Sequence, residues 1–304
     1  MRFISSALAL GALAAIVVTT PATAQPIRIP ESPAALNPEI IVQGERRLEP
    51  QEIDQGIDQL TRRTGLFEPV SRFVSPVCVL VIGLGDAKDA KIAARIRSNV
   101  QAVGLQLAAK PDCRPNAITI ITDDPRKTFS LIRRKRPFLI GHPVLREFSI
   151  ASVEGQLKAG RPAVSWSTYA AGQIENLAPL ATPGAVPGFW GWNSAPAFAR
   201  GGNPRFSTVL LLDWKQLDGV HVDQLADFAT IHLLGSPRTS GRASDSKAPT
   251  ILSLFEDGPG RAPQRLTTFD RAYLCGLYHL RQSMPNSRMN QNMRDVYDTQ
   301  CVRV

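Results

Sequence analysis

Val77-Cys-Val-Leu-Val-Ile-Gly83 is a short and almost wholly apolar run, typical of a β-strand that is covered on both faces. A helix is expected next, with Asp86 as its cap, since Ile92, Ile96, Val100 and Val103 recur at three- and four-residue spacing. Gly104 ends this helix, residues 105–107 begin a second strand, and residues 117–121 form a third. The order predicts a βαβ unit with parallel strands.

The same pattern continues toward the C-terminus. Helices are expected from Asp123-Asp124-Pro125 to about Arg136 and over residues 143–157, followed by a fourth strand over residues 162–169. A fifth strand, residues 207–213, precedes a helix over residues 223–234, and Thr267 with Asp270 makes a capping box for another helix. We therefore predict an α/β (α+β) fold, with a mixed, mainly parallel sheet, packed helices and additional C-terminal helices, in one domain over residues 71–304.

The helix within Gln224-Leu-Ala-Asp-Phe-Ala-Thr-Ile-His-Leu-Leu-Gly235 resembles the active-site helix of zincin metalloproteases, in which H-E-x-x-H places two zinc ligands on one face. Further short matches follow in the family's order, namely Leu234-Gly235, Ile251-Leu-Ser-Leu-Phe255, Leu266-Thr-Thr-Phe-Asp270 and Leu277-Tyr278. Over about residues 73–280, the chain is similar to uncharacterised exported bacterial proteins of zincin-like (metzincin-like) type. This resemblance implies a zincin-like fold.

The zinc chemistry of that family does not carry over residue by residue. Phe228 and Ala229 stand where the first histidine and the glutamate would be, so only His232 of the motif remains. A catalytic zinc needs three protein ligands, and Arg238 occupies the position of the third metzincin histidine. We predict no metal, no cofactor and no catalytic residue of the zincin kind, with His232 as a hydrogen-bonded core residue.

Two functions therefore stay open. The first is a non-catalytic, zincin-like protein of the cell envelope with a binding or structural role. The second is a secreted hydrolase or metallopeptidase-like enzyme of unrecognised mechanism, for which Asp213, Asp227, His232 and Asp270 would have to converge. A nucleotide site at Gly83-Leu84-Gly85 is not supported, because a dinucleotide fingerprint needs a third glycine where Lys88 stands.

Export is predicted from the N-terminus. Residues 1–24 combine Arg2, an apolar run over residues 8–18 and Ala22-Thr23-Ala24, the pattern of a cleaved signal peptide, so we expect a periplasmic or secreted protein without a transmembrane span after cleavage. In an oxidising compartment the four cysteines are expected to pair. Cys78 and Cys113 lie near the starts of strands that would be neighbours, which leaves Cys275 to pair with Cys301.

Residues 25–70 are rich in Pro, Glu and Arg and are predicted to be poorly ordered or peripheral. Within them, Glu39-Ile-Ile-Val-Gln-Gly-Glu-Arg-Arg47 resembles a segment that follows the signal in some TonB-dependent receptors, and we interpret it as a tether or edge strand. The formal net charge of +9 favours an anionic envelope component or an acidic peptide as partner, whereas export argues against nucleic acid.

A candidate groove follows from the zincin resemblance, which places the fourth strand along the edge of the cleft. Residues 171–206 are rich in Gly, Pro and aromatic residues and are predicted to be a long loop over that cleft. An extended peptide is the ligand that an edge strand would bind. The residues of this candidate groove are Trp166, Ser167, Thr168 and Tyr169 of the strand, Trp190 and Trp192 of the loop, and Phe228 and His232 of the helix.

Overall fold

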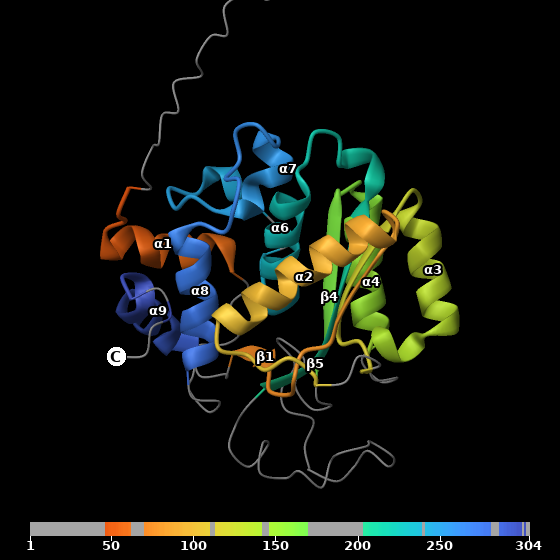
Figure 1. Cartoon of the computed structure of the whole chain (residues 1–304), viewed down its shortest axis with the longest axis horizontal. Helices are drawn as coiled ribbons and strands as arrows, with labels where there is room; N and C mark the ends of the chain where they lie inside the picture. The colour runs from red at the N-terminus through yellow and green to blue at the C-terminus, as the bar shows by residue number, and fades with distance from the viewer. Residues whose placement is uncertain are drawn as a thin grey trace, which may run out of the picture. The chain divides into compact units, whose positions relative to one another are not determined.

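The computed structural model in Figure 1 describes residues 46–61, 70–109, 113–141, 146–169, 203–238, 241–280, 286–299 and 301. The α-helices are α1 (Pro50–Leu60), α2 (Asp86–Ala102), α3 (Pro125–Lys135), α4 (Arg146–Lys158), α6 (Val222–Leu234), α7 (Leu254–Asp257), α8 (Thr268–His279) and α9 (Met289–Tyr297). Short 3-10 helices are η1 (Pro137–Leu139), η2 (Trp214–Gln216), η3 (Ala243–Asp245), η4 (Ile251–Ser253) and η5 (Asn286–Arg288).

The sheet is mixed and mainly parallel. Its strands are β1 (Ser71–Phe73), β2 (Val79–Ile82), β3 (Ala117–Thr122), β4 (Ala163–Tyr169) and β5 (Asn203–Asp213). β3 pairs in parallel with β2 and with β5, and the short β1 is parallel to the start of β5. β4 pairs antiparallel with the same β5 residues that pair with β3, so β3 and β4 flank β5. The predicted mixed α/β fold with a mainly parallel sheet is confirmed.

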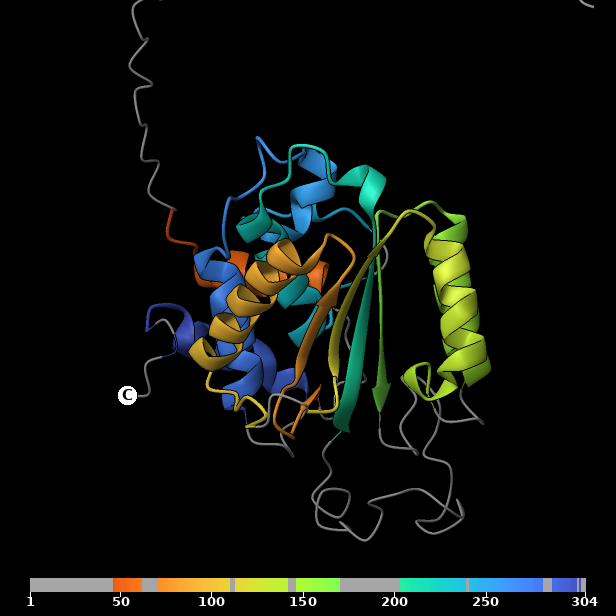
Figure 2. The ribbon, with the colours of Figure 1, turned by 45° about the vertical axis from the view of Figure 1, so that its right-hand side comes forward.

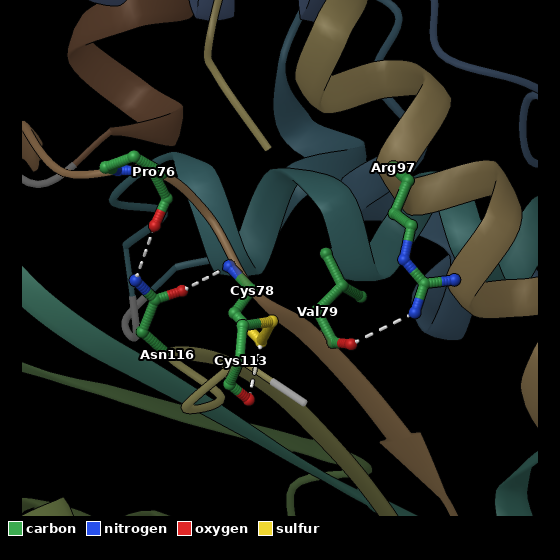
Figure 3. The surroundings of a disulfide bond; sticks show 6 residues. All are labelled: Pro76, Cys78, Val79, Arg97, Cys113 and Asn116. Carbon is green, nitrogen blue, oxygen red and sulfur yellow. Dashed lines mark hydrogen bonds between the residues drawn. A yellow bond between two sulfur atoms is a disulfide. The ribbon is translucent and has the colours of Figure 1, made fainter. Parts of the chain in front are cut away.

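The βαβ unit forms as β2, α2 and β3, and it carries the first predicted disulfide. Cys78 and Cys113 are bonded near the starts of the two strands, where the Asn116 side chain also joins them (Figure 3). Its Oδ1 accepts from the Cys78 amide at 2.8 Å, and its Nδ2 donates to the Pro76 carbonyl. Cys275 and Cys301 form the second disulfide, so both predicted pairings are confirmed.

Helices cover both faces of the sheet (Figure 2). α3 and α4 lie on one face over a smaller core, whose members include Ile118, Phe129, Val153 and Trp166. α2 and α6 lie on the opposite face, where a larger core extends to α1, α8 and α9. The near-continuous apolar sequence of β5 is explained by this burial, because successive side chains point into different cores.

Several sequence-based boundaries were wrong. Residues 50–60, predicted to be poorly ordered, form α1, whose Ile53, Ile57 and Leu60 are buried on one stripe. The predicted loop over residues 171–206 ends earlier, because β5 begins at Asn203. Residues 105–107 provide only a bridge between Val77 and Leu107 instead of a strand. The spacing of apolar residues did not predict where these helices and strands begin and end, because packing partners outweigh local propensity there.

The predicted cap at Asp86 was also wrong. Gly85 is the N-cap of α2, and the Asp89 carboxylate accepts from the amides of Gly83 and Leu84 at 3.0 Å. Gly83 has φ of 127°, and a Cβ there would lie 2.0 Å from the Ile121 carbonyl oxygen. The glycines therefore serve a tight turn whose amides bind Asp89, which agrees with rejection of a nucleotide site.

The predicted signal peptide and the receptor-like segment at residues 39–47 lie outside the described residues, except for Arg46 and Arg47. None of the helices in the described part of the chain is long and apolar enough to cross a membrane. This finding and the two disulfides are compatible with a secreted or periplasmic protein.

Candidate functional site

The site is built around α6, which carries the degenerate motif. The helix is buried along most of its length, packing on α2 and against β5. It ends at Gly235, where a Cβ would lie 2.7 Å from the Ile231 carbonyl oxygen and 2.8 Å from the Tyr273 ring, so only glycine fits the predicted Leu-Gly turn.

A buried arginine holds the C-terminal end of this helix. The Arg205 guanidinium donates to the carbonyls of Leu233, Leu234 and Gly235, and also to Ser71. The carbonyl end of a helix carries partial negative charge, which offsets the cost of burying this cation. Arg205 thus fixes α6 to both β1 and β5, a role that sequence reasoning missed because the residue lay in the predicted loop.

Phe228 and His232 face the same way, one helical turn apart. Their ring centroids lie 4.5 Å apart, and Phe255 packs edge-on against Phe228 at 4.9 Å. Phe228 is only 2% exposed. The space one turn before His232 on this face of α6 is therefore filled by an aromatic cluster.

His232 is held from the strand side. Its Nδ1 lies 3.0 Å from the Ser165 hydroxyl of β4, at hydrogen-bond distance. Burial lowers the pKa of His232 to about 3, although one side of the ring lines a cavity. Burial thus favours the neutral imidazole. His232 is hydrogen-bonded as expected, but it is half-buried beside the cavity and is not part of the core.

A cavity of about 150 Å³ adjoins this pair, between α6, the start of β4 and residues that follow α6, namely Pro237, Arg238, Gly241, Arg242, Ala243, Leu252, Phe255 and Glu256. Its apolar lining includes Phe228, Leu252 and Phe255. Its charged lining consists of Arg161, Arg238, Arg242 and Glu256. Three cations and one anion around an apolar floor favour a ligand with an anionic group beside an apolar group.

The predicted groove residues of β4 are split between the two faces of the sheet. Trp166 packs edge-on against Phe129 at 5.4 Å in the α3–α4 core, and its Nε1 donates to the Leu139 carbonyl. Thr168 bonds Ser207, and Ser167 bonds Thr208. Assigning Trp166 to the groove was wrong, because consecutive strand residues point to opposite faces. Trp190 and Trp192 lie outside the described residues.

The carboxylates proposed for an enzyme do not converge with His232. Asp227 is fully buried and accepts from Arg95, Asn99 and the Leu266 amide. Asp270 accepts from Thr250 and from the amides of Ile251 and Thr267, and Asp213 accepts from the Lys215 amide. Each carboxylate stabilises a helix start or a helix pair, and its hydrogen-bond partners differ from those of His232.

The described residues do not fit a zincin metal. Among them, no group of three or more His, Cys, Asp or Glu side chains is placed to hold an ion. The Phe228 ring occupies the space beside His232 where a second ligand would be needed.

Sequence reasoning also missed Ser165 and the arginines of the cavity. The strand pleat offered a signal for Ser165, because it shares a face with Ser167 and Tyr169. Arg161 lies far from α6 in the sequence, whereas Arg242 follows the helix by eight residues. Only the folded chain places both around one cavity. Comparison with known proteins gives no further guide, since no family model, curated protein or solved structure matches the chain.

Proposed function

We propose that this is a non-catalytic, zincin-like binding protein of the cell envelope, which receives an extended peptide between β4 and α6. The observation that carries the proposal is the arginine-lined cavity, which lies at the start of β4 and beside the Phe228–His232 pair. A predicted signal peptide and the two disulfides support an envelope location.

The backbone of β4 provides the binding edge. The Asp213 amide donates to the Pro162 carbonyl, and these residues are opposite each other in the antiparallel register. Even-numbered residues of β4 therefore bond to β5, while the backbone groups of Ala163, Ser165 and Ser167 point away from β5. Among the described strands, β4 pairs only with β5, and an extended peptide can pair with such an edge strand.

The site supports binding better than proteolysis. Phe228 and Ala229 provide neither a metal ligand nor a general base where a zincin needs them. The His232 ring is hydrogen-bonded to Ser165 and packs at a tilt against the Phe228 ring, and these contacts fix it beside the cavity.

Amide hydrogen exchange by NMR tests the proposal. The oxidised full chain is mixed with pentapeptides that are randomised at four positions and end in leucine. We expect the amides of Ala163, Ser165 and Ser167 to gain protection. The amides of Val164 and Thr168, which already face β5, are the internal control and should change little. Unchanged exchange at all five positions under excess peptide would refute the groove.

The competing function is a hydrolase, and the Ser165–His232 contact is the observation that favours it. A serine nucleophile needs a base that a third group orients, and Asp213, Asp227 and Asp270 are each bound elsewhere. Incubation with a fluorophosphonate probe separates the two functions. The binding protein should remain unlabelled, whereas covalent labelling of Ser165, absent in Ser165→Ala, would establish the enzyme.

A further inference from the structure

We propose that the cavity beside Phe228 binds the free C-terminal carboxylate of a peptide whose last side chain is apolar, and that the peptide runs antiparallel to β4. This inference rests on the proposed peptide groove and assigns its direction and its end. It uses the placement of three arginines, Arg161, Arg238 and Arg242, around one cavity.

Charge is the first argument. Arg161, Arg238 and Arg242 line the cavity together with a single acid, Glu256. Its Oε2 accepts from the Ser244 amide at 2.7 Å, and its one negative charge is outnumbered by the three guanidinium groups. A carboxylate gains charge-assisted, geometrically matched hydrogen bonds from guanidinium groups, whereas an ammonium group would be repelled.

Direction follows from the position of the arginines along the strand. Arg161 and Pro162 immediately precede β4, and Ala163 is its first residue, so the cavity lies at the N-terminal end of the strand. A peptide that pairs antiparallel with β4 brings its own C-terminus to that end. A parallel peptide would bring its N-terminal ammonium to the arginines, so the charge selects the antiparallel arrangement.

Size and lining identify the last residue. The cavity of about 150 Å³ is smaller than sites for whole small molecules, which span about 300–1,000 Å³. Phe228, Leu252 and Phe255 form the apolar part, and the arginine side chains form the charged part. One apolar side chain with its adjoining carboxylate matches both parts.

The arginines differ in how well they serve as tests. Arg238 donates through Nε to the Thr61 carbonyl, so its removal would also disturb the contact with the end of α1. Arg161 and Arg242 are therefore the better sites for substitution. Arg134 is the matched control, because it is exposed on α3, across the sheet from the cavity.

The experiment compares two pentapeptide mixtures, both ending in leucine, one as the free acid and one as the carboxamide. Retention by the oxidised full chain is measured by mass spectrometry, and affinities of selected members by fluorescence anisotropy. We expect the acids to bind about tenfold more tightly than the amides, the size of one charge-assisted contact. Arg161→Gln and Arg242→Gln should each remove most of that preference, and Arg134→Gln should leave it unchanged.

The outcomes separate the two proposals. Equal binding of acids and amides, with protection of the β4 amides, would overturn the carboxylate assignment and leave the groove standing. Binding of neither mixture would overturn both. Binding to anionic phospholipid vesicles that depends on Arg161 and Arg242, without peptide binding, would show that the arginines serve a membrane surface and would overturn the peptide assignment.

Discussion

The two faces of β4 show opposite uses of the same strand. On one face, Val164 and Trp166 are buried in the α3–α4 core, with an indole that is packed and hydrogen-bonded. On the other face, Ala163 lines the cavity and Ser165 holds His232. The difference teaches that adjacent residues of one strand divide between stability and the candidate site, so a groove assigned to a continuous run of residues mixes the two.

The largest loss of unfolding free energy should come from substitution on the face of β4 that packs against α3 and α4. Trp166→Ala removes the edge-on contact with Phe129 and the bond to Leu139, and should cost about 3–5 kcal/mol of unfolding free energy. Ser165→Ala on the opposite face should cost about 1 kcal/mol, the net value of one hydrogen bond. Urea denaturation of both variants measures the contrast, and equal losses would contradict the division of the strand.

The Cys78–Cys113 disulfide tests whether binding at β4 depends on the stability of the whole fold. It lies near the starts of β2 and β3, on the opposite side of the sheet from β4. Replacement of both cysteines by alanine should lower the unfolding free energy by about 3 kcal/mol, through loss of loop closure. Peptide binding at the β4 edge should be kept at temperatures where the variant is folded. Loss of binding by the folded variant would mean that the site is not local to β4 and α6.

On the other face of β4, the contact with His232 should make the unfolding free energy depend on pH. Its folded pKa of about 3 lies below the ordinary value of 6.5, so the unfolded chain binds the proton more readily. The contribution of His232 to the unfolding free energy is therefore fully present above pH 6.5 and decreases as the pH falls toward 3. By pH 5 this decrease should amount to at most about 2 kcal/mol.

Chemical denaturation at pH 7 and pH 5 measures this loss. The difference attributable to His232 should disappear in His232→Gln and persist in His221→Gln, the exposed residue that precedes α6. A loss that is the same in wild type and His232→Gln would place its origin in other groups.

The smallest effect is expected when zinc is added to the protein. Phe228 and Ala229 replace a ligand and the base, so purified protein should contain far less than one zinc per chain, and added zinc should not raise the melting temperature. His232→Ala should leave the metal content unchanged. Elemental analysis that finds about one zinc per chain, lost in His232→Ala, would contradict the binding-protein proposal.

Several elements were predictable because their signals are local. The spacing of Ile92, Ile96 and Val100 predicts α2, and the Thr267–Asp270 capping box marks the start of α8. The pairing of Cys78 with Cys113 followed from parallel neighbours whose starts are close. α1 was not predicted, because its short apolar stripe is stabilised mainly by burial, as where Gly56 fits against Phe269.

The sequence by itself determined the class of fold and the two disulfides, and it showed that Phe228 and Ala229 offer neither a metal ligand nor a general base. Tertiary structure alone decided which residues share the candidate site. Ser165 reaches His232 only because β4 pairs with β5 beside α6, and Arg161 and Arg242 line one cavity only because the chain folds around the start of that strand. Local patterns record periodicity and caps, whereas a site is made by contacts between residues that are far apart in the chain, and those depend on packing of the whole domain.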